Sequence, residues 1–277
     1  MVSRILFLAA VLALNACGGG NQASTALAPT PNAQPTHTAW VPVPGAGYEW
    51  QLSGTLDTTV VAPVYDIDGF GTTSAQVASL HAAGRNAVCY IDAGTFETGR
   101  PDAAAFPTSV IGNPDAGWPG EFWLDIRQLA TLGPIMTARF QMCASKGFDA
   151  IEADNVDGFD NPTGFAIGAP DQLTYNTFLA QQAHLLGLSI ALKNDPTQAT
   201  TLAPIFDFAL AEDCYVQGWC MQLTPFLTEH KAVIAVEYTD LTTSATFTTV
   251  DCPAAHTAGI TTILKDRALD AWIETCP

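Results

Sequence analysis

Positive charge is scarce in this sequence. Only 10 of the 277 residues are Lys or Arg, against 27 Asp and Glu, which gives a formal charge of -17. Binding nucleic acid requires clustered cations to neutralise phosphates, so this composition argues strongly against a nucleic-acid partner. A cationic or neutral ligand fits better, although the same acidic residues would also serve simply to keep an exported protein soluble.

Several motifs for cofactors and nucleophiles are missing as well. No G-x-G-x-x-G follows the first expected strand, and neither a phosphate loop nor G-x-S-x-G occurs. The five histidines lie in a tether, helices and loops rather than at strand ends, so neither a histidine metal site nor a Ser-His-Asp triad is indicated. The acidic residues from Asp154 to Asn161 lack the spacing of a calcium loop, and we therefore expect no cofactor and no metal.

The N-terminal segment is typical of an exported protein. Arg4 precedes an apolar stretch at 5–14, too short to span a bilayer, and residues 14–18 read Leu-Asn-Ala-Cys-Gly, similar to a bacterial lipoprotein signal. This predicts a signal peptide at 1–16, and a lipidated Cys17 followed by a flexible tether to residue 44. We expect an exported lipoprotein of the cell envelope, held at the membrane only by its lipid. If Cys17 is not lipidated, the protein is secreted.

Cysteine usage agrees with export. Apart from Cys17, six cysteines remain, and an even number in an oxidising compartment suggests three disulfides out of fifteen possible pairings. Proximity and position favour Cys214 with Cys220 and Cys252 with Cys276. Cys89 and Cys143 are the remaining two.

Short apolar, β-branched runs followed by charged residues recur along the chain. The expected strands are 50–52, 61–65, 87–91, 148–151, 188–192, 208–211, 233–236 and 260–264. The expected helices are 74–83, 126–146 and 172–186, each followed by a glycine, which is a common helix stop.

Alternation of buried strands with helices predicts a parallel sheet. Apolar residues form 48% of the chain, enough for one large domain. Eight strands over residues 45–277 predict an α/β fold, a (β/α)8 TIM-like barrel that is irregular between its first two strands, where no helix fits. A doubly wound open sheet is the competing fold. If Asp92 faces the barrel mouth, Tyr90 points inward and Cys89 outward, toward the helix that carries Cys143, so these two form a sensible bridge.

Carboxylates gather at the expected strand ends. Glu152 and Asp154 are two residues apart and share a face, and Glu212 lies at the same end two strands later. Hydrolysis of a glycosidic bond requires one carboxylic acid and one carboxylate, which Asp154 and Glu212 would supply. A single Asp at a strand end more often caps a helix or bonds a loop, so the argument depends on the whole set. The same rim would hold Asp66, Asp68, Asp92, Asp195 and Glu237, whose repulsion would raise some of their pKa values.

Other residues suit the same site. Lys193 is a rare cation at a strand end and would orient a carboxylate or tune its pKa, or form a plain salt bridge. The Pro- and Gly-rich segment 95–123 carries Trp118 and Trp123, which suits a loop that covers a cleft and stacks on sugars. Trp50 would do the same, unless these tryptophans are simply buried.

Ordered motifs from about Trp40 to the C-terminus resemble glycoside hydrolase family 114, the endo-α-1,4-polygalactosaminidase barrels. The matching pieces are Tyr-Asp-Ile-Asp at 65–68, Cys-Tyr-Ile-Asp-Ala-Gly at 89–94 with Glu97 and Arg-Pro-Asp at 100–102, Trp-Pro-Gly-Glu at 118–121 with Trp-Leu-Asp at 123–125, Asp-Asn-Val-Asp-Gly at 154–158, Lys-Asn-Asp at 193–195, Phe-Asp-Phe-Ala at 206–209, Glu212 with Cys214 and Cys220, and Val-Glu-Tyr at 236–238.

The resemblance implies a (β/α)8 fold and endo-cleavage of α-1,4-linked galactosamine polymers, which are partly deacetylated and therefore cationic. It also implies retention of configuration, with Asp154 as the nucleophile and Glu212 as the acid/base. The family commonly has Ser where this chain has Asp92. The substrate-binding candidates are Trp50, Tyr65, Asp66, Asp68, Tyr90, Asp92, Trp123, Glu152, Lys193, Asn194, Asp195, Glu237 and Tyr238.

The sequence thus predicts a monomeric, exported glycosidase with a polysaccharide substrate. Two alternatives stay open. A cell-surface barrel that binds the glycan without cutting it would tolerate replacement of Asp154 by Asn. A hydrolase of another α-linked glycan would keep both carboxylates but ignore amine-rich polymers.

Overall fold

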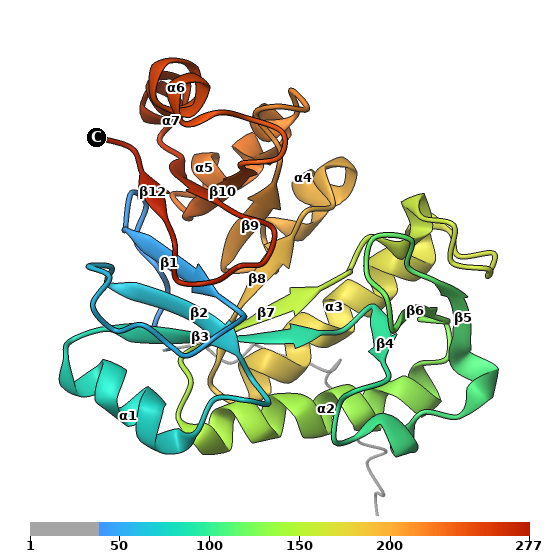
Figure 1. The fold of residues 1–277 in the computed structure, drawn as a ribbon. Helices are drawn as coiled ribbons and strands as arrows, with labels where there is room; N and C mark the ends of the chain where they lie inside the picture. The colour runs from blue at the N-terminus through green and yellow to red at the C-terminus, as the bar shows by residue number, and fades with distance from the viewer. Residues whose placement is uncertain (1–38) are drawn as a thin grey trace, which may run out of the picture. The chain divides into compact units, whose positions relative to one another are not determined.

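Strands and helices alternate from Tyr48 to the C-terminus (Figure 1). The computed structural model describes residues 39–277, so the expected signal peptide, Cys17 and most of the expected tether lie outside the described residues. Eight parallel strands neighbour one another in chain order. They are β1 (Tyr48–Gln51), β2 (Val64–Asp68), β3 (Asn86–Asp92), β7 (Ala150–Asp154), β8 (Ser189–Lys193), β9 (Phe208–Glu212), β10 (Val233–Tyr238) and β11 (Thr261–Lys265).

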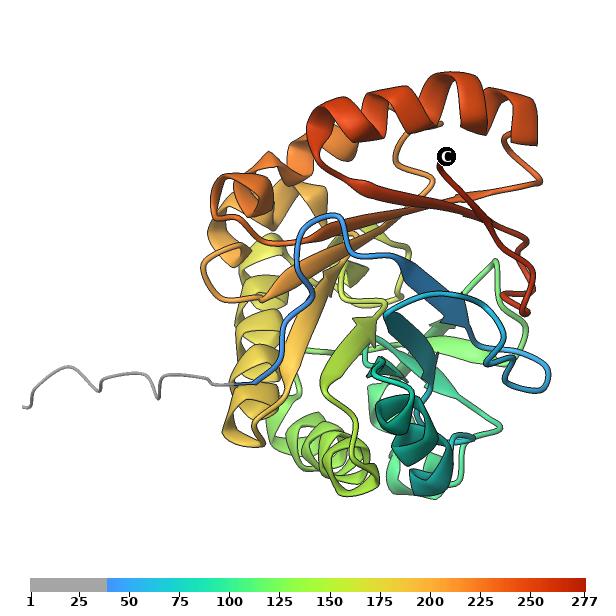
Figure 2. The same ribbon diagram turned by 90° about the vertical axis from the view of Figure 1, so that its left-hand side faces the viewer.

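The sheet curls so that its first and last parallel strands, β1 and β11, approach each other without pairing (Figures 1 and 2). The short strand β12 (Glu274–Thr275) adds antiparallel to β11. Across the seam, Lys265 Nζ lies 2.8 Å from Glu49 Oε1, with both side chains fully buried. Backbone N–H groups of Leu52 and Ser53 donate to Leu269 O at 2.8 and 3.0 Å. The α/β barrel of eight parallel strands is therefore confirmed, with a seam held largely by side chains and loop backbone.

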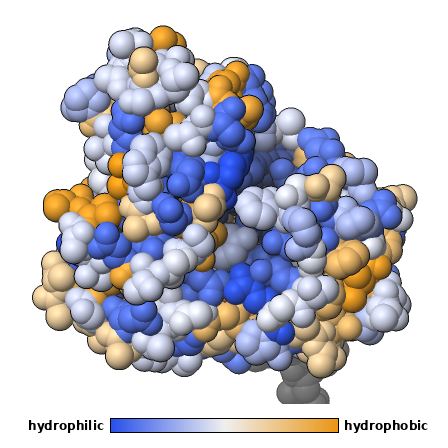
Figure 3. Space-filling view, viewed as in Figure 1, coloured by the Kyte–Doolittle hydropathy of each residue, from blue (hydrophilic) through white to orange (hydrophobic). Residues whose placement is uncertain are grey.

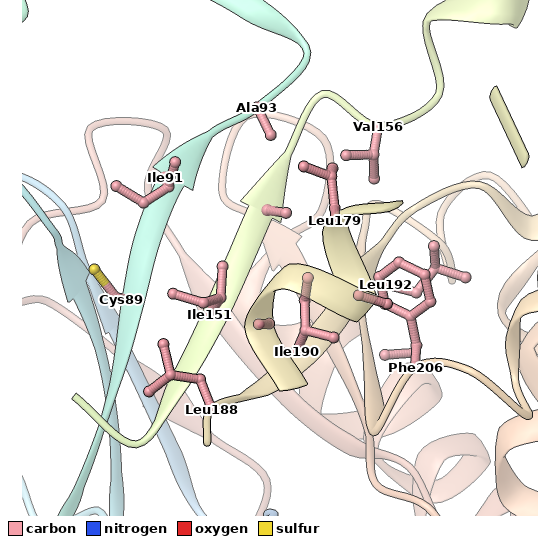
Figure 4. Packing of buried hydrophobic residues seen from close by; sticks show 14 of the residues in the cluster. Cys89, Ile91, Ala93, Ile151, Val156, Leu179, Leu188, Ile190, Leu192 and Phe206 are labelled. Atoms are coloured by element: carbon pink, nitrogen blue, oxygen red, sulfur yellow. The ribbon is translucent and has the colours of Figure 1, made fainter. Parts of the chain in front are cut away.

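Side chains alternate between two cores. The inner face of the strands carries an apolar layer that includes Trp50, Val88 and Phe208. The outer face packs on the helices, where Ile91 and Ile151 meet helical residues such as Leu179 (Figure 4). Because successive side chains of a strand point to opposite faces, inner positions near the carboxyl ends hold the charged residues.

Helices cover the outside of the curled sheet (Figure 2). The α-helices are α1 (Ser74–Ala82), α2 (Leu129–Lys146), α3 (Ala169–Leu185), α4 (Ala199–Leu202), α5 (Thr224–Thr228), α6 (Ser244–Thr246) and α7 (Cys252–Ala258). Helix α2 ends at Gly147, whose φ of 92° is left-handed and thus favours glycine. No helix lies between β1 and β2, as expected. None of the helices described here has the length and hydropathy to cross a membrane.

Short turns complete the chain. The 3-10 helices are Ala103–Ala105, Thr108–Val110, Gly158–Asp160, Pro196–Gln198 and Cys220–Leu223, and Phe247–Asp251 is a π-helix.

The segment 95–123, expected to be a loop, contains most of a second sheet. Strands β4 (Thr95–Glu97), β6 (Glu121–Leu124) and β5 (Ile111–Pro114) pair antiparallel in that order. These strands are too short, and too rich in Pro and Gly at their borders, to give a strand pattern in the sequence. This small sheet follows β3 directly, so it stands beside the carboxyl ends of the barrel strands (Figure 1).

Three disulfides join the pairs that the sequence favoured. Cys89 of β3 binds Cys143 of α2, which confirms that Cys89 points outward to the helices. Cys214 binds Cys220, and Cys252 binds Cys276. Disulfides of this number are typical of proteins that fold in an oxidising compartment.

We expect the Cys89–Cys143 bridge to stabilise the barrel more than the Cys214–Cys220 bridge. The two bridges span 54 and 6 residues, and a crosslink over a longer loop removes more entropy from the unfolded chain. The double variant Cys89→Ala/Cys143→Ala should lose about 4 kcal/mol, against about 2 kcal/mol for Cys214→Ala/Cys220→Ala. Denaturant unfolding of both variants measures this, and equal losses would contradict it.

Candidate active site

A cleft of about 260 Å³ opens over the carboxyl ends of the barrel strands. Figure 3 shows hydrophilic residues around a hollow near the centre of this face. One wall comes from the small sheet and the segments between its strands, and another from the loops after β1 and β11. The lining residues include Trp50, Asp68, Tyr90, Glu97, Arg100, Trp118, Glu121, Asp154, Asn155, Lys193, Glu212 and Arg267.

Lys193 lies at the floor of this cleft and is only 1% exposed. Its Nζ is 2.9 Å from Asp154 Oδ1, 3.1 Å from Glu212 Oε2 and 3.1 Å from Glu152 Oε1. The same ammonium lies 4.6 Å from the centre of the Trp50 ring, close enough for a cation–π contact. Since an isolated buried charge is costly, these partners are what keep the ammonium charged.

Asp154 is held in its ionised form. Burial alone would raise its pKa, but the charge of Lys193 and hydrogen bonds from Lys193, Tyr90 and the Asn155 N–H lower the pKa below the usual value. Tyr90 Oη donates to Asp154 Oδ2 at 2.8 Å, and Asn155 N donates to Oδ1 at 2.9 Å. The carboxylate is thus fixed on both oxygens and faces the cleft.

Glu212 lies across Lys193 from Asp154. Tyr238 Oη donates to Glu212 Oε1 at 2.5 Å, and Asn194 accepts from the Glu212 backbone N–H at 3.0 Å. Because Asp154 Oδ1 and Glu212 Oε2 lie 2.9 and 3.1 Å from one nitrogen, these two oxygens are no more than 6.0 Å apart. Two carboxyl groups at this separation can act on opposite sides of one bond.

A second layer of acids lies beneath Lys193. Burial raises the pKa of Asp66 to about 6, although hydrogen bonds from Glu152 and Tyr48 oppose the shift. Burial and the neighbouring Asp66 raise the pKa of Glu152 well above its usual range. Glu152 therefore holds a proton more readily than an ordinary glutamate, although its Oε1 lies 3.1 Å from Lys193 Nζ.

Asp92, where the resembled family commonly has Ser, is buried behind Asp154. It accepts hydrogen bonds from Thr95 and from Asn155 Nδ2, the latter at 3.2 Å. Burial and the charge of Asp154 raise its pKa to about 7. In the cleft wall, burial and Asp92 raise the pKa of Glu121 to about 8.

The structure does not bring every expected binding residue into the cleft. Tyr65 lies on the outward face of β2, where its hydroxyl donates to Val60 O. Glu237 accepts from the backbone N–H groups of Tyr215 and Val216, behind the sheet. Trp123 is a buried residue of β6, and Asp195 contacts Asn176 of α3. The remaining candidates lie around the cleft or directly beneath it.

Sequence reasoning missed Arg267 and Trp219. Arg267 follows β11 by two residues and lies over the Tyr238 ring, with its guanidinium carbon 3.9 Å from the ring centre. Trp219 comes from the loop closed by Cys214 and Cys220. The only feature of the sequence that could have pointed to Trp219 is its position shortly after Glu212.

One set of side chains in residues 39–277 has the geometry of metal ligands, namely Cys214, Cys220 and Glu237. Both sulfurs are in a disulfide, so the set offers a single carboxylate and fits no metal.

Paired carboxylates in a cleft over the carboxyl ends of barrel strands are the arrangement that glycoside hydrolases use. Residues 29–277 match the model of glycoside-hydrolase family GH114, so the chain belongs to this family and is a glycoside hydrolase. A comparison with curated protein sequences gives no match.

Solved structures agree with this family. The chain is similar to Aspergillus fumigatus Ega3, solved in complex with galactosamine, at 34% identity and a TM-score of 0.82, covering 86% of this chain and 97% of that one. The glycoside hydrolase domain of PelA from Pseudomonas aeruginosa has a TM-score of 0.63 at 12% identity, covering 83% of this chain and 97% of that domain. The second likeness concerns the fold alone.

Buried acids at this site should make the protein more stable at mildly acidic pH. The folded pKa values of Asp92, Glu121 and Asp195 are raised to about 7, 8 and 8, chiefly by burial. Such groups stabilise the fold fully below their unfolded pKa near 4, and this contribution is lost as pH rises through the folded values. The lowered pKa of Asp154 changes the stability of the fold only at lower pH, around and below the usual pKa of an aspartate.

We therefore expect the melting temperature to fall between about pH 5 and about pH 8. Asp195 lies outside the cleft, and Asp195→Asn removes its titrating group. The fall in melting temperature should therefore be smaller in this variant. Thermal melts of both proteins across the pH range test this, and a melting temperature that rises with pH would contradict it.

Proposed function

We propose that this hydrolase cleaves α-1,4-linked, galactosamine-rich polysaccharide within the chain, by a retaining mechanism that uses Asp154 and Glu212. The observation that carries the proposal is the position of Lys193, whose ammonium contacts both carboxylates at the floor of the cleft. Arg100 bridges a second lining pair, Asp68 and Glu97, but Glu97 belongs to the small sheet, whereas Asp154 and Glu212 both end barrel strands.

In the first half of the reaction, Asp154 attacks the anomeric carbon and forms a bond to it. The bond to the glycosidic oxygen breaks, its electron pair stays on that oxygen, and Glu212 supplies the proton for the leaving chain. In the second half, Glu212 takes a proton from water, the water oxygen bonds to the same carbon, and Asp154 is released. Two displacements on opposite faces give net retention.

Charge and spacing support these roles. The lowered pKa of Asp154 favours the ionised form that a nucleophile requires. Oxygens no more than 6.0 Å apart leave little room for a water between carboxylate and sugar, which favours retention over inversion. Tyr238 donates to Glu212 Oε1 and Lys193 Nζ lies 3.1 Å from Oε2, so both oxygens of this carboxyl group are held in place beside Asp154.

The substrate class follows from cleft charge and from the relative. Five carboxyl groups line the cleft and can pair with the ammonium groups of a cationic polymer such as partly deacetylated galactosamine. Ega3, at 34% identity, was solved with galactosamine. Trp118 is 48% exposed in this cleft and offers a face on which a sugar ring can stack.

The domain boundaries and the cellular location are also part of the proposal. Residues 1–16 would be a signal peptide, Cys17 would carry the lipid, 17–44 would be the tether and 45–277 the catalytic barrel. The disulfides support folding in an oxidising compartment. The enzyme would thus act as a monomer on polymer near the cell envelope.

Asp154→Asn and Glu212→Gln should each lower the release of reducing ends from partly deacetylated α-1,4-galactosamine polymer. Loss of the acid/base should cost about 100- to 10,000-fold in rate, and loss of the nucleophile at least as much. The controls are Asp160→Asn and Glu229→Gln, which make the same chemical changes at exposed sites.

Fully acetylated polymer and other α-linked glycans serve as comparison substrates. Cleavage only of another α-linked glycan would replace the proposed substrate. Undiminished activity of either carboxylate variant would remove that residue from the mechanism.

The first product released should carry the α configuration at its new reducing end. Proton NMR of the anomeric signals, recorded before the sugars equilibrate in water, distinguishes the two outcomes. Early β product would show inversion and would mean that Asp154 activates water instead of attacking carbon.

A further inference from the structure

A second hollow, of about 440 Å³, adjoins the active-site cleft over the carboxyl ends of β8 and β9. It shares Glu212 and Arg267 with the cleft, whereas Asp154 and Lys193 line the cleft alone. Its other walls include Asn194, Gln217, Trp219 and Gln222. The two spaces therefore meet at the residue proposed as acid/base.

We infer that this second hollow binds the leaving-group end of the sugar chain, with Trp219 as the surface on which a sugar ring stacks. The inference rests on the proposed function. An acid/base protonates the glycosidic oxygen, so it lies between the sugar attacked by the nucleophile and the sugar that leaves. Since Asp154 faces only the cleft, the leaving sugar must extend past Glu212 into the neighbouring space.

The loop that carries Trp219 is built as a rigid platform. Its ends are joined by the Cys214–Cys220 disulfide, and Trp219 N donates to Cys214 O at 2.8 Å. The indole is half-buried against the outer core, and its Nε1 donates to Gln217 Oε1 at 3.2 Å. A fixed, partly open ring is the surface that sugar faces use for stacking, because little side-chain freedom remains to be lost.

Arg267 joins the two spaces. Its guanidinium lies over the ring of Tyr238, the residue that donates to Glu212, and its Nη2 is 2.7 Å from Asp213 Oδ2. Around it, the side-chain amides of Asn194, Gln217 and Gln222 offer both donors and acceptors, as sugar hydroxyls require. The ligand is thus one or more further hexosamine residues of the same polymer. Binding on both sides of the acid/base is what cleavage within a chain demands.

The test compares two substrates, of which only one has a sugar as its leaving group. One is the partly deacetylated α-1,4-galactosamine polymer. The other is the α-fluoride of an α-1,4-galactosamine trisaccharide, whose leaving group is a single atom and cannot fill the second hollow. The variants are Trp219→Ala and Gln222→Ala, and the matched control is Trp272→Ala, an exposed tryptophan outside both spaces.

Trp219→Ala should lower kcat/KM for the polymer about 10-fold or more and leave fluoride release within about twofold of the parent enzyme. Gln222→Ala should lower only the polymer value, by a smaller factor, and Trp272→Ala should change neither. Unchanged fluoride turnover also shows that the variants are folded.

Equal losses of Trp219→Ala on both substrates, or no loss on either, would overturn the inference while the proposed function stands. Failure of the parent enzyme on both substrates would instead overturn the proposed function and, with it, this inference. The activity of the parent enzyme therefore tells the two failures apart.

Discussion

The ammonium of Lys193, buried inside a parallel barrel, is the group on which the active site depends. Transfer of a lone charge out of water costs several kcal/mol, and only paired carboxylates at short distance offset it. Here Glu152, Asp154 and Glu212 lie within 3.1 Å of one nitrogen, and the Trp50 ring lies beside it. The same contacts that stabilise the lysine therefore fix the distance between the two proposed catalytic groups.

This arrangement requires a barrel interior that is apolar at one end and carries ionisable side chains at the other. Toward the amino ends of the strands the interior is apolar, with Val88 and Phe208 in contact with their neighbours. Toward the carboxyl ends, burial raises the pKa values of Asp66 and Glu152, the acids below Lys193. The catalytic end thus combines buried acids with the ammonium of Lys193, which lies among them.

Loops that follow the barrel strands form the walls of the cleft and of the hollow beside it. The small sheet after β3 forms one side of the cleft, and the disulfide-closed loop after β9 forms the neighbouring hollow. A barrel tolerates such insertions at its carboxyl end because they do not interrupt strand pairing. The family membership of the chain therefore agrees with its geometry: in the proposed function, the strand ends supply the catalytic groups and the loops supply the surface for sugar.

The sequence by itself indicated the parallel strands and the gathering of acids at one rim, because parallel strands place their carboxyl ends together, and it favoured the three disulfide pairs that the structure shows. Strand alternation set Cys89 outward, and the same rule, applied to Tyr65 beside Asp66 and to Glu237 beside Tyr238, would have set those two residues outward as well. Only the tertiary structure decided the rest. Which acids touch Lys193, how the segment after β3 folds and where Trp219 lies all depend on contacts between segments far apart in the chain, and no local pattern encodes such distances.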